Sequence, residues 1–310
     1  MKKWNKIVIA GGSGFLGESL TGYLKPLTGE IVILTRGKET VNDGVRYVHW
    51  DGKTAGAWTE ELEGADVVLN MCGKSVDCRY TAKNKALIFS SRLEPTAALG
   101  KAIAAAKQAP GLWINAASAT IYRHSEAGDL QMTETGGEIG EGFSVEVCKA
   151  WEKTFYSFET PGTRKVNLRI GMVLGNAGGV FPTLCKMTKL GLGGRMGNGK
   201  QLMSWMHVTD FCEMVSWCIT HAEVQGTYNC TAPEPVSNAD FMKWLRTRLH
   251  VAVGLPASTW MLAFGAFFIR TEPELVLKSR NAIPQKAMEQ GFRFAFPDAL
   301  GCIENLLQKK

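Results

Sequence analysis

Short apolar runs alternate with longer amphipathic stretches along most of the chain. Runs of β-branched and aliphatic residues are typical of strands that are buried on both faces. Amphipathic stretches predict helices over 82–107 and 144–158, a helix that begins at Asp210, and another capped by Ser237 or Asn238. Strands that alternate with helices predict a doubly wound parallel sheet, the Rossmann fold of the α/β class. The predicted strands are 7–10, 31–35, 45–50, 66–71, 112–118, 165–175 and 226–232.

The first apolar run leads directly into a cluster of glycines. Gly11, Gly14 and Gly17 recur at a spacing of three, and Gly12 completes the pattern G-x-G-x-x-G with the last two. Glycines let the chain turn tightly and approach a pyrophosphate, and the following helix presents free N–H groups to phosphates. The pattern therefore predicts a dinucleotide site, with a glycine-rich turn that binds nothing as the alternative. We expect this site to contain Gly11, Gly12, Ser13, Gly14, Phe15, Leu16 and Gly17.

The end of the second predicted strand indicates which dinucleotide binds. An NAD site places an Asp or Glu on the ribose 2′-hydroxyl, about twenty residues beyond the glycine loop. Thr35 and Arg36 stand there instead, and Lys38 lies nearby. A guanidinium can hold a 2′-phosphate through two parallel hydrogen bonds, whereas a carboxylate would repel it. The sequence therefore predicts NADP(H) rather than NAD(H), with a solvated loop position for Arg36 as the alternative.

The domain organisation follows from where glycine becomes dense. Between residues 175 and 201, frequent glycines predict a long irregular segment or a lid. We expect residues 1–174 to form an NAD(P)-binding Rossmann domain, to which residues 203–232 return. Residues 175–310 are expected to form the glycine-rich lid and a smaller, mixed C-terminal substrate lobe. A chain of 310 residues is long enough to bury cores of this size.

Composition and charge narrow the range of partners. The formal net charge is +6, and the lysines and arginines are scattered, so a nucleic-acid surface is not indicated. A small anionic ligand fits this balance better. The eight cysteines form no C-x-x-C pair and no zinc-like spacing with the five histidines, so we expect no metal site and a reducing compartment. No signal-peptide pattern precedes the first strand, so we expect a cytoplasmic protein.

One long uncharged stretch raises the question of a membrane. Residues 251–269 carry no charge and are nearly long enough to span a bilayer. They also contain a proline and two glycines, and they lack a clearly basic flank on one side. We therefore expect no transmembrane segment but a loop followed by a buried helix. A peripheral membrane contact or a subunit interface, such as that of a homodimer, is the alternative.

Several motifs together resemble those of the extended short-chain dehydrogenases/reductases, which include nucleotide-sugar epimerases. Besides the glycine loop, these are NMCG (70–73), SATIY (118–122), LRIGMVLG (168–175) and SWMHVTD (204–210). The stretches LGLGGRMGNGKQLMSWMHVTD and TAPEPVSNADF are similar to those of an atypical subgroup, the epimerase-family proteins of unassigned activity. The resemblance runs from the first strand to about Asp298.

The resemblance implies a Tyr and, four residues later, a Lys that perform the proton chemistry of this superfamily. None of the six tyrosines is followed by Lys at that spacing. When Glu152 is aligned with the family's usual Glu, Ser144 takes the Tyr position and Cys148 takes the Lys position. Neither can do the same job, and Lys149 faces elsewhere, about 100° around the helix. Cys148 is either an inert thiol on an apolar helix face, which we favour, or a nucleophile or redox-active group.

The candidate site residues lie where predicted strands end, because parallel sheets bind ligands there. Ser118 keeps the family's Ser position and is a catalytic candidate together with Tyr122; strand termination and ordinary packing are their alternatives. Arg92 is otherwise a helix-surface cation, and capping of a helix is favoured for Asp210 over a substrate-side role. The remaining cofactor candidates are Thr35, Arg36, Asp51, Met71, Cys72, Gly73, Arg92 and Val173. The substrate-side candidates are Arg195, Lys200, Trp205 and His207.

These observations lead to two main hypotheses of function. The first is an NADP(H)-dependent oxidoreductase or epimerase that acts on a nucleotide-sugar or a similar polar metabolite. The intact glycine loop, Ser118 and the glycine-rich lid favour it, although the missing Tyr and Lys leave its proton donor unnamed. The second is a non-catalytic NADP(H)-binding sensor or regulatory protein, which the missing pair favours. A structural protein with a vestigial loop is a third, less favoured hypothesis.

Overall fold

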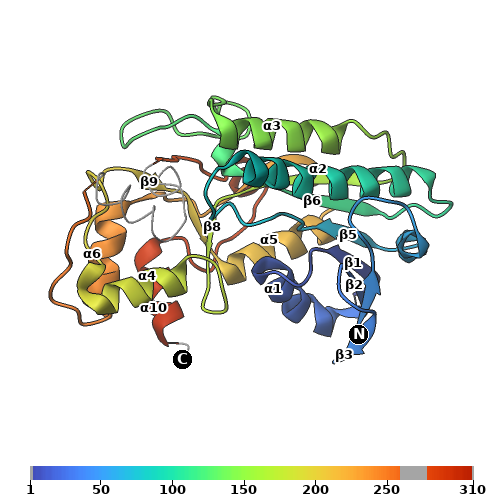
Figure 1. The fold of residues 1–310 in the computed structure, drawn as a ribbon, viewed down its shortest axis with the longest axis horizontal. Helices are drawn as coiled ribbons and strands as arrows, with labels where there is room; N and C mark the ends of the chain where they lie inside the picture. Colours follow the sequence, from blue (N-terminus) through green and yellow to red (C-terminus); the bar gives the residue numbers. More distant parts are fainter. Residues whose placement is uncertain (1–2, 259–277, 309–310) are drawn as a thin grey trace.

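Eight strands form the main sheet of the protein (Figure 1). The computed structural model describes residues 3–258 and 278–308. The strands are β1 (Trp4–Ala10), β2 (Thr28–Thr35), β3 (Thr40–Asn42), β4 (Val45–His49), β5 (Val67–Asn70), β6 (Leu112–Ser118), β7 (Arg164–Ile170) and β11 (Gly226–Cys230). They follow the order β11-β7-β6-β5-β1-β2-β4-β3, and every neighbouring pair is parallel except β3 with β4. The predicted doubly wound parallel sheet is confirmed.

The apolar runs form strands that are covered on both faces. In β1, Ile7 and Ile9 pack into one buried cluster, whereas Val8 and Ala10 pack into another. Successive side chains of a strand point to opposite faces, so a strand covered on both sides must be apolar at every position. The continuous apolar runs of the sequence are therefore the signature of two helical layers.

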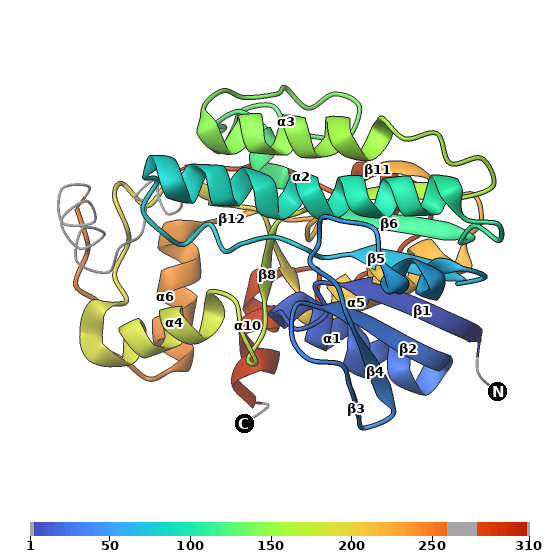
Figure 2. The same ribbon diagram turned by 45° about the vertical axis from the view of Figure 1, so that its right-hand side comes forward.

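Two pairs of helices form these layers (Figure 2). The first pair is α1 (Phe15–Leu24) with α5 (Val208–Thr220), and the second is α2 (Ala82–Ala105) with α3 (Phe143–Tyr156). The two pairs lie on opposite faces of the sheet, and the members of each pair contact each other. Helices α2 and α3 agree with the predicted helices to within two residues at each end.

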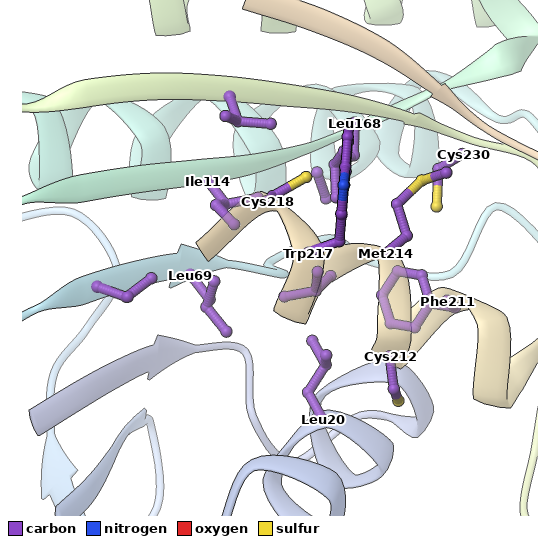
Figure 3. Close-up of a cluster of buried hydrophobic side chains, with 14 of the residues drawn as sticks. Leu20, Leu69, Ile114, Leu168, Phe211, Cys212, Met214, Trp217, Cys218 and Cys230 are labelled. Atoms are coloured by element: carbon purple, nitrogen blue, oxygen red, sulfur yellow. The ribbon is translucent and has the colours of Figure 1, made fainter. Parts of the chain in front are cut away.

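The core between α5 and the sheet is shown in Figure 3. Phe211 and Met214 of α5 lie between helix α1, which contributes Leu20, and the strands that carry Leu69 and Leu168. All five side chains are buried. This packing fixes α1 against the sheet and thereby places the glycine loop that precedes it.

Strand β1 is the switch point of the sheet. Its neighbours are β2 on one side and β5 on the other, so the chain leaves β1 in one direction and later crosses back past it. Open α/β sheets bind ligands beyond the carboxyl ends of the strands at this point. We call the residues that follow these three strands, 11–17, 35–36 and 71–73, the switch edge.

A smaller lobe lies to one side of the sheet, at the left of Figure 1. Its buried core includes Phe181, Trp205, Phe241 and Ile303. The short strands pair as β8 (Met172–Leu174) with β10 (Trp205–His207) and β9 (Leu202–Met203) with β12 (Val236–Ser237). The remaining α-helices are α4 (Phe181–Met187), α6 (Asn238–Arg248), α9 (Gln285–Glu289) and α10 (Ala299–Gln308). The shorter helical turns are η1 (Lys25–Leu27), η2 (Ala57–Leu62), η3 (Ala119–Ile121) and η4 (Thr188–Leu192).

Two predicted segments differ from the structure. The strand predicted over 165–175 breaks at Gly171 into β7 and β8, because the chain there passes the carbonyl oxygen of Ser204, which would lie 2.5 Å from a Cβ. The glycine-dense segment 175–201 is not irregular throughout, since it contains α4 and the π-helical turn η4.

The uncharged stretch of the sequence is described only in part. Residues 251–258 contain no helix, and the rest of the stretch, in which a buried helix is expected, lies outside the described residues. None of the described helices combines the length and the apolar character needed to cross a bilayer.

Candidate functional site

The glycine loop is closed toward the protein and open toward the outside. A Cβ on Gly11, which has φ of +78°, would lie 2.8 Å from the carbonyl carbon of Met71. A Cβ on Gly17 would lie 2.5 Å from the Cα of Gly12. On Gly14, by contrast, the nearest atom to an added Cβ is the carbonyl oxygen of Gly11 at 3.8 Å. The first contacts explain why glycine is needed, and the last leaves room for a ligand at the loop's outer face.

Helix α1 begins at this open face. Gly14 is its N-cap, and no side chain caps the first turn. The N–H groups at the start of a helix have no partner within the helix and carry a partial positive charge. The ring of Phe15 packs beneath Gly175, Gly178 and Gly179, which keeps the loop after β8 close to the glycine loop. The residues present therefore fit the diphosphate of a dinucleotide.

Arg36 stands exposed at the end of β2. Among the described residues, none forms an ion pair or a hydrogen bond with its guanidinium group. Burial raises the pKa of the Cys72 thiol to about 12, and the charge of Arg36 acts in the opposite direction. Thr35 accepts a hydrogen bond from the N–H of Gly37 at 3.1 Å, which shapes the turn that presents Arg36.

Asp51 follows β4 and organises its own turn. Its carboxylate accepts hydrogen bonds from the N–H groups of Lys53 and Thr54, both at 2.8 Å, and from the Thr54 hydroxyl at 2.7 Å. The bonds from Thr54, followed by that from Lys53, lower the pKa of Asp51 to about 2. Its predicted cofactor contact stays a prediction, and its observed partners all lie within three residues of it.

A buried network of amide and hydroxyl groups supports the switch edge from below. Asn70 Nδ2 donates to Thr96 Oγ1 at 2.9 Å and to Asn115 Oδ1 at 2.8 Å. Asn70 Oδ1 accepts from the N–H of Cys72 at 3.2 Å, and Trp151 Nε1 donates to Thr96 at 3.0 Å. The network links β5, β6, α2 and α3, so it positions the residues after β5. Sequence reasoning missed it, although an Asn inside each of two apolar strands was the available signal.

Arg92 reaches the switch edge from α2. Its Nη1 donates to the carbonyl oxygens of Lys74 and Ile88, both at 3.1 Å. The guanidinium lies against Gly73, where a Cβ would be 3.3 Å from its Cζ, and that Cζ is 5.2 Å from the ring centroid of Trp151. Burial lowers its pKa, and no carboxylate of the described chain pairs with it. Arg92 is thus a half-buried cation suited to an anion or hydroxyl of a ligand.

Ser144 and Cys148 lie on α3, at the positions where the family resemblance would place Tyr and Lys. Cys148 is buried, and burial followed by the nearby charge of Glu152 raises its pKa to about 12. A thiol in such surroundings is a poor nucleophile, since the thiolate is the reactive form. The inert interpretation of Cys148 is therefore the one that the structure favours. Ser144 is half-buried.

The two catalytic candidates have structural partners. Ser118 ends β6, accepts the N–H of Thr120 at 3.2 Å and so caps η3. Tyr122 is fully buried, and its hydroxyl accepts from Arg169 Nη1 at 2.8 Å and lies 2.8 Å from Asn229 Oδ1. A phenol enclosed in this way packs as a structural residue, which was the alternative interpretation of Tyr122. Ser118 is only half-buried and keeps its place at the carboxyl edge.

Arg169 connects Tyr122 to α3 through a largely buried ion pair. Its Nε and Nη2 bond the two carboxylate oxygens of Glu152 at 2.8 and 2.9 Å. The two side chains are 11 % and 13 % exposed. Bidentate geometry and burial make this a strongly coupled pair. The sequence places Arg169 at the end of a predicted strand but does not show this ion pair, because Glu152 lies on another element, 17 residues away.

Three strand-end and substrate-side candidates turn out to be core residues. Val173 is buried in β8 and pairs with β10. Trp205 is fully buried in the lobe core, with Nε1 donating to the carbonyl oxygen of Glu234 at 2.9 Å. His207 is also buried, and its Nδ1 accepts the N–H of Thr209 at 2.9 Å as the cap of α5. The predicted substrate-side roles of both residues stay predictions.

Two other predictions concern residues on the same part of the chain. Asp210 is not the cap of α5; it lies buried in the first turn and accepts the N–H groups of Ala295 and Phe296 at 2.8 and 3.0 Å. The capping role fails because His207 already fills it. Arg195 and Lys200 are exposed, and their predicted role toward a substrate stays a prediction.

Two protein-family models match successive parts of the chain. Residues 7–231 match the NAD dependent epimerase/dehydratase family, and residues 257–306 match a domain of unknown function, DUF1731. The chain belongs to the NAD dependent epimerase/dehydratase family. Within this family it is an atypical extended short-chain dehydrogenase/reductase, as its motifs indicate.

Relatives of this family match the chain over nearly its whole length. The epimerase family protein YfhF of Bacillus subtilis is 34% identical over 304 residues, which cover 97% of each chain. The epimerase family protein SDR39U1 of Bos taurus is 30% identical and covers 97% of this chain and 99% of its own. The structure of human SDR39U1 with NADPH has a TM-score of 0.87 at 25% identity, covering 98% of this chain and 100% of that one. These likenesses support a site for a nicotinamide dinucleotide.

More distant family structures share the fold alone. The UDP-N-acetylglucosamine 4-epimerase of Bacillus cereus has a TM-score of 0.72 at 17% identity, covering 98% of this chain and 99% of that one. At this identity the likeness carries the arrangement of strands and helices and no chemistry.

Proposed function

We propose that this protein is an NADP(H)-dependent oxidoreductase or epimerase that acts on a nucleotide-sugar or a similar polar metabolite. The observation that carries the proposal is the switch edge, where an open glycine loop lies near an unpaired arginine. The glycine loop fits a dinucleotide diphosphate because Gly11 and Gly17 close its inner side while Gly14 leaves its outer side open. The human relative whose structure contains NADPH supports the choice of cofactor.

Each part of the cofactor has residues suited to it. The N–H groups at the start of α1 would hold the diphosphate, and Arg36 would bind the 2′-phosphate, with Lys38 adding charge. The residues after β5, Met71 to Gly73, would pass along the cofactor, and Arg92 beneath Gly73 would hold one of its hydroxyls or anionic groups. When bound, the nicotinamide supplies or accepts a hydride.

The side chain best placed to act on a substrate oxygen is that of Ser118. It ends β6 at the carboxyl edge of the sheet and is half-buried, so its hydroxyl can form a hydrogen bond with a ligand there. Tyr122 is not part of the proposal, because Arg169, Asn229 and the carbonyl oxygen of Thr133 surround its hydroxyl. Ser118 therefore orients the substrate in this proposal, and no residue is assigned as the proton donor.

The cofactor assignment is tested by calorimetric titration with NADPH and with NADH. We expect wild-type protein to bind NADPH at least tenfold more tightly, a difference of about 1.4 kcal/mol. The variant Arg36→Ala should close this gap by weakening NADPH alone. Arg293→Ala is the matched control, because Arg293 is also an exposed arginine but follows α9, far along the chain from the switch edge. Failure of both dinucleotides to bind would refute the proposal.

A second candidate function is a non-catalytic NADP(H)-binding protein. The observation that favours it is the replacement of the expected Tyr and Lys by Ser144 and the buried, unreactive Cys148. Turnover separates the two functions: protein loaded with NADP⁺ is incubated with a panel of nucleotide-sugars, and formation of NADPH or an epimerised product is measured. Binding of the cofactor without any turnover across the panel would favour the second function.

A further inference from the structure

An exposed apolar patch lies at the outer end of the smaller lobe. Ten large hydrophobic side chains are exposed in the described part of the chain, and four of them gather there. In Figure 2 the end of α4 and the stretch that follows α6 reach the same outer end of the lobe. We call the four residues the apolar tip; they are Leu190 (67 % exposed), Leu192 (46 %), Val253 (63 %) and Leu255 (57 %).

Hydrogen bonds hold the two segments of the tip together. The N–H of Leu255 donates to the carbonyl oxygen of Gly191 at 2.8 Å. Arg246, at the end of α6, donates through Nη1 to the carbonyl oxygen of Gly193 at 2.6 Å. The tip is therefore a built surface in which two loops are tied to each other, and its leucines are held outward by the backbone beneath them.

The two chain segments that form the tip carry charge of a single sign. Residues 181–200 and 241–258 contain no Asp or Glu. Only Arg248 among their basic residues pairs with a carboxylate of the described chain, that of Glu304. Asp240 lies at the opposite end of α6. The basic residues of the two segments are Lys186, Lys189, Arg195, Lys200, Lys243, Arg246, Arg248 and His250, if protonated.

We propose that the apolar tip docks on the surface of an anionic lipid bilayer. Exposed leucine and valine side chains among unpaired lysines match a membrane interface, where aliphatic groups enter the headgroup boundary and cations meet lipid phosphates. A second copy of the chain fits less well, because a symmetric contact would bring the same cations together. A nucleic acid fits less well too, because the tip offers aliphatic rather than aromatic groups for its bases.

The test is co-sedimentation of the full chain with vesicles. Vesicles of phosphatidylcholine with phosphatidylglycerol are compared with vesicles of phosphatidylcholine alone. We expect the protein to sediment with the anionic vesicles only and to be released by added salt. Leu190→Ser/Leu255→Ser and Lys186→Glu/Lys189→Glu should each lower the partition coefficient at least about tenfold.

A matched control variant distinguishes binding through the tip from nonspecific hydrophobic binding. Val41→Ser/Leu130→Ser removes two aliphatic side chains that are equally exposed, at 66 % and 52 %, but lie outside the tip. This variant should bind vesicles like the wild type, and thermal melting should show that all variants fold. Equal binding to neutral vesicles, an equal loss in the control variant, or no binding by wild-type protein would overturn the proposal. Light scattering that shows a dimer dissociated by Leu190→Ser/Leu255→Ser, without vesicle binding, would assign the tip to a subunit interface instead.

Discussion

At the switch edge the guanidinium of Arg36 and the start of α1 are left open, whereas between α3, β6 and β7 the polar side chains are bonded to one another. Arg36 has no ion pair in the described chain, and no side chain caps α1. In the second region, Tyr122, Arg169 and Glu152 form one connected set of hydrogen bonds. Both regions belong to the carboxyl half of the sheet, where parallel sheets bind ligands.

This contrast shows which part of the proposed site is open to a ligand. A buried polar group needs a hydrogen-bond partner, and in the second region the protein itself supplies those partners. At the switch edge, the N–H groups at the start of α1 and the guanidinium of Arg36 are left for water or a ligand to bind. The switch edge is therefore the part of the proposed site that has room for a ligand, and the region around Tyr122 is filled by the protein's own hydrogen bonds.

Glu152→Gln has the largest expected effect. It tests the second region, which we call the closed region. It removes the charge that balances Arg169 while both groups remain buried, so we expect a loss of about 3–5 kcal/mol in the free energy of unfolding. Urea unfolding measures it. Glu146→Gln is the control, since Glu146 forms a pair with Lys149 on the exposed side of the same helix. That change should cost less than about 0.5 kcal/mol, and equal losses would contradict the comparison.

Asp210 extends the comparison to the junction of α5 with the C-terminal segment. Burial raises its pKa from 3.8 to about 6, although the N–H groups of Ala295 and Phe296 act in the opposite direction. Between these values the folded state holds a proton that the unfolded state has released. The stability contributed by this group is therefore present below about pH 4 and lost as the pH rises through 6, by about 3 kcal/mol in all.

The measurement compares wild-type protein with Asp210→Asn by urea unfolding at pH 4.5 and pH 7.5. Other carboxyl groups titrate in both proteins, so only the difference between them reports Asp210. The free energy of unfolding of the wild type, relative to that of the variant, should be higher at pH 4.5 than at pH 7.5 by about 2–3 kcal/mol. Asp240→Asn, at an exposed position, is the control for replacing a carboxyl group by an amide. A difference independent of pH would mean that Asp210 is charged in the folded protein.

Gly17→Ala tests whether the switch edge depends on the close packing of the glycine loop against itself. The new Cβ would meet the Cα of Gly12 at 2.5 Å, so the backbone must move. We expect a loss of about 1–3 kcal/mol in stability and at least a tenfold loss in NADPH affinity. Gly22→Ala in the same helix meets nothing within 4 Å and should stabilise the protein by up to about 1 kcal/mol. Normal NADPH binding by Gly17→Ala would refute the assigned role of the loop.

The strand, loop and helix of the switch edge could be predicted because their signals are local. An apolar strand, glycines at a fixed spacing and a following helix lie within twenty residues, and Arg36 follows directly from the next strand. The layers of the fold were equally accessible, since short continuous apolar runs are typical of strands covered on both faces.

Contacts between residues that are distant along the chain could not be predicted. Asn70 meets Thr96 and Asn115 across 26 and 45 residues, and Asp210 meets Phe296 across 86. The burial of Trp205 shows the same limit, because its ring packs in the lobe core among residues from other segments of the chain. Sequence patterns give the residue types at such positions and cannot give their partners.

The smallest expected effect belongs to Tyr122→Phe, and it decides how the closed region is understood. The change removes one hydroxyl, leaving Arg169 Nη1 and Asn229 Oδ1 without a bond they now make. We expect a loss of about 1–2 kcal/mol in stability, with NADPH affinity unchanged. If a substrate that turns over is found, its rate should also change little at temperatures where the variant is folded. A fall of a hundredfold or more in the rate, with stability and cofactor binding intact, would instead make Tyr122 the missing proton donor and end the contrast between the two regions.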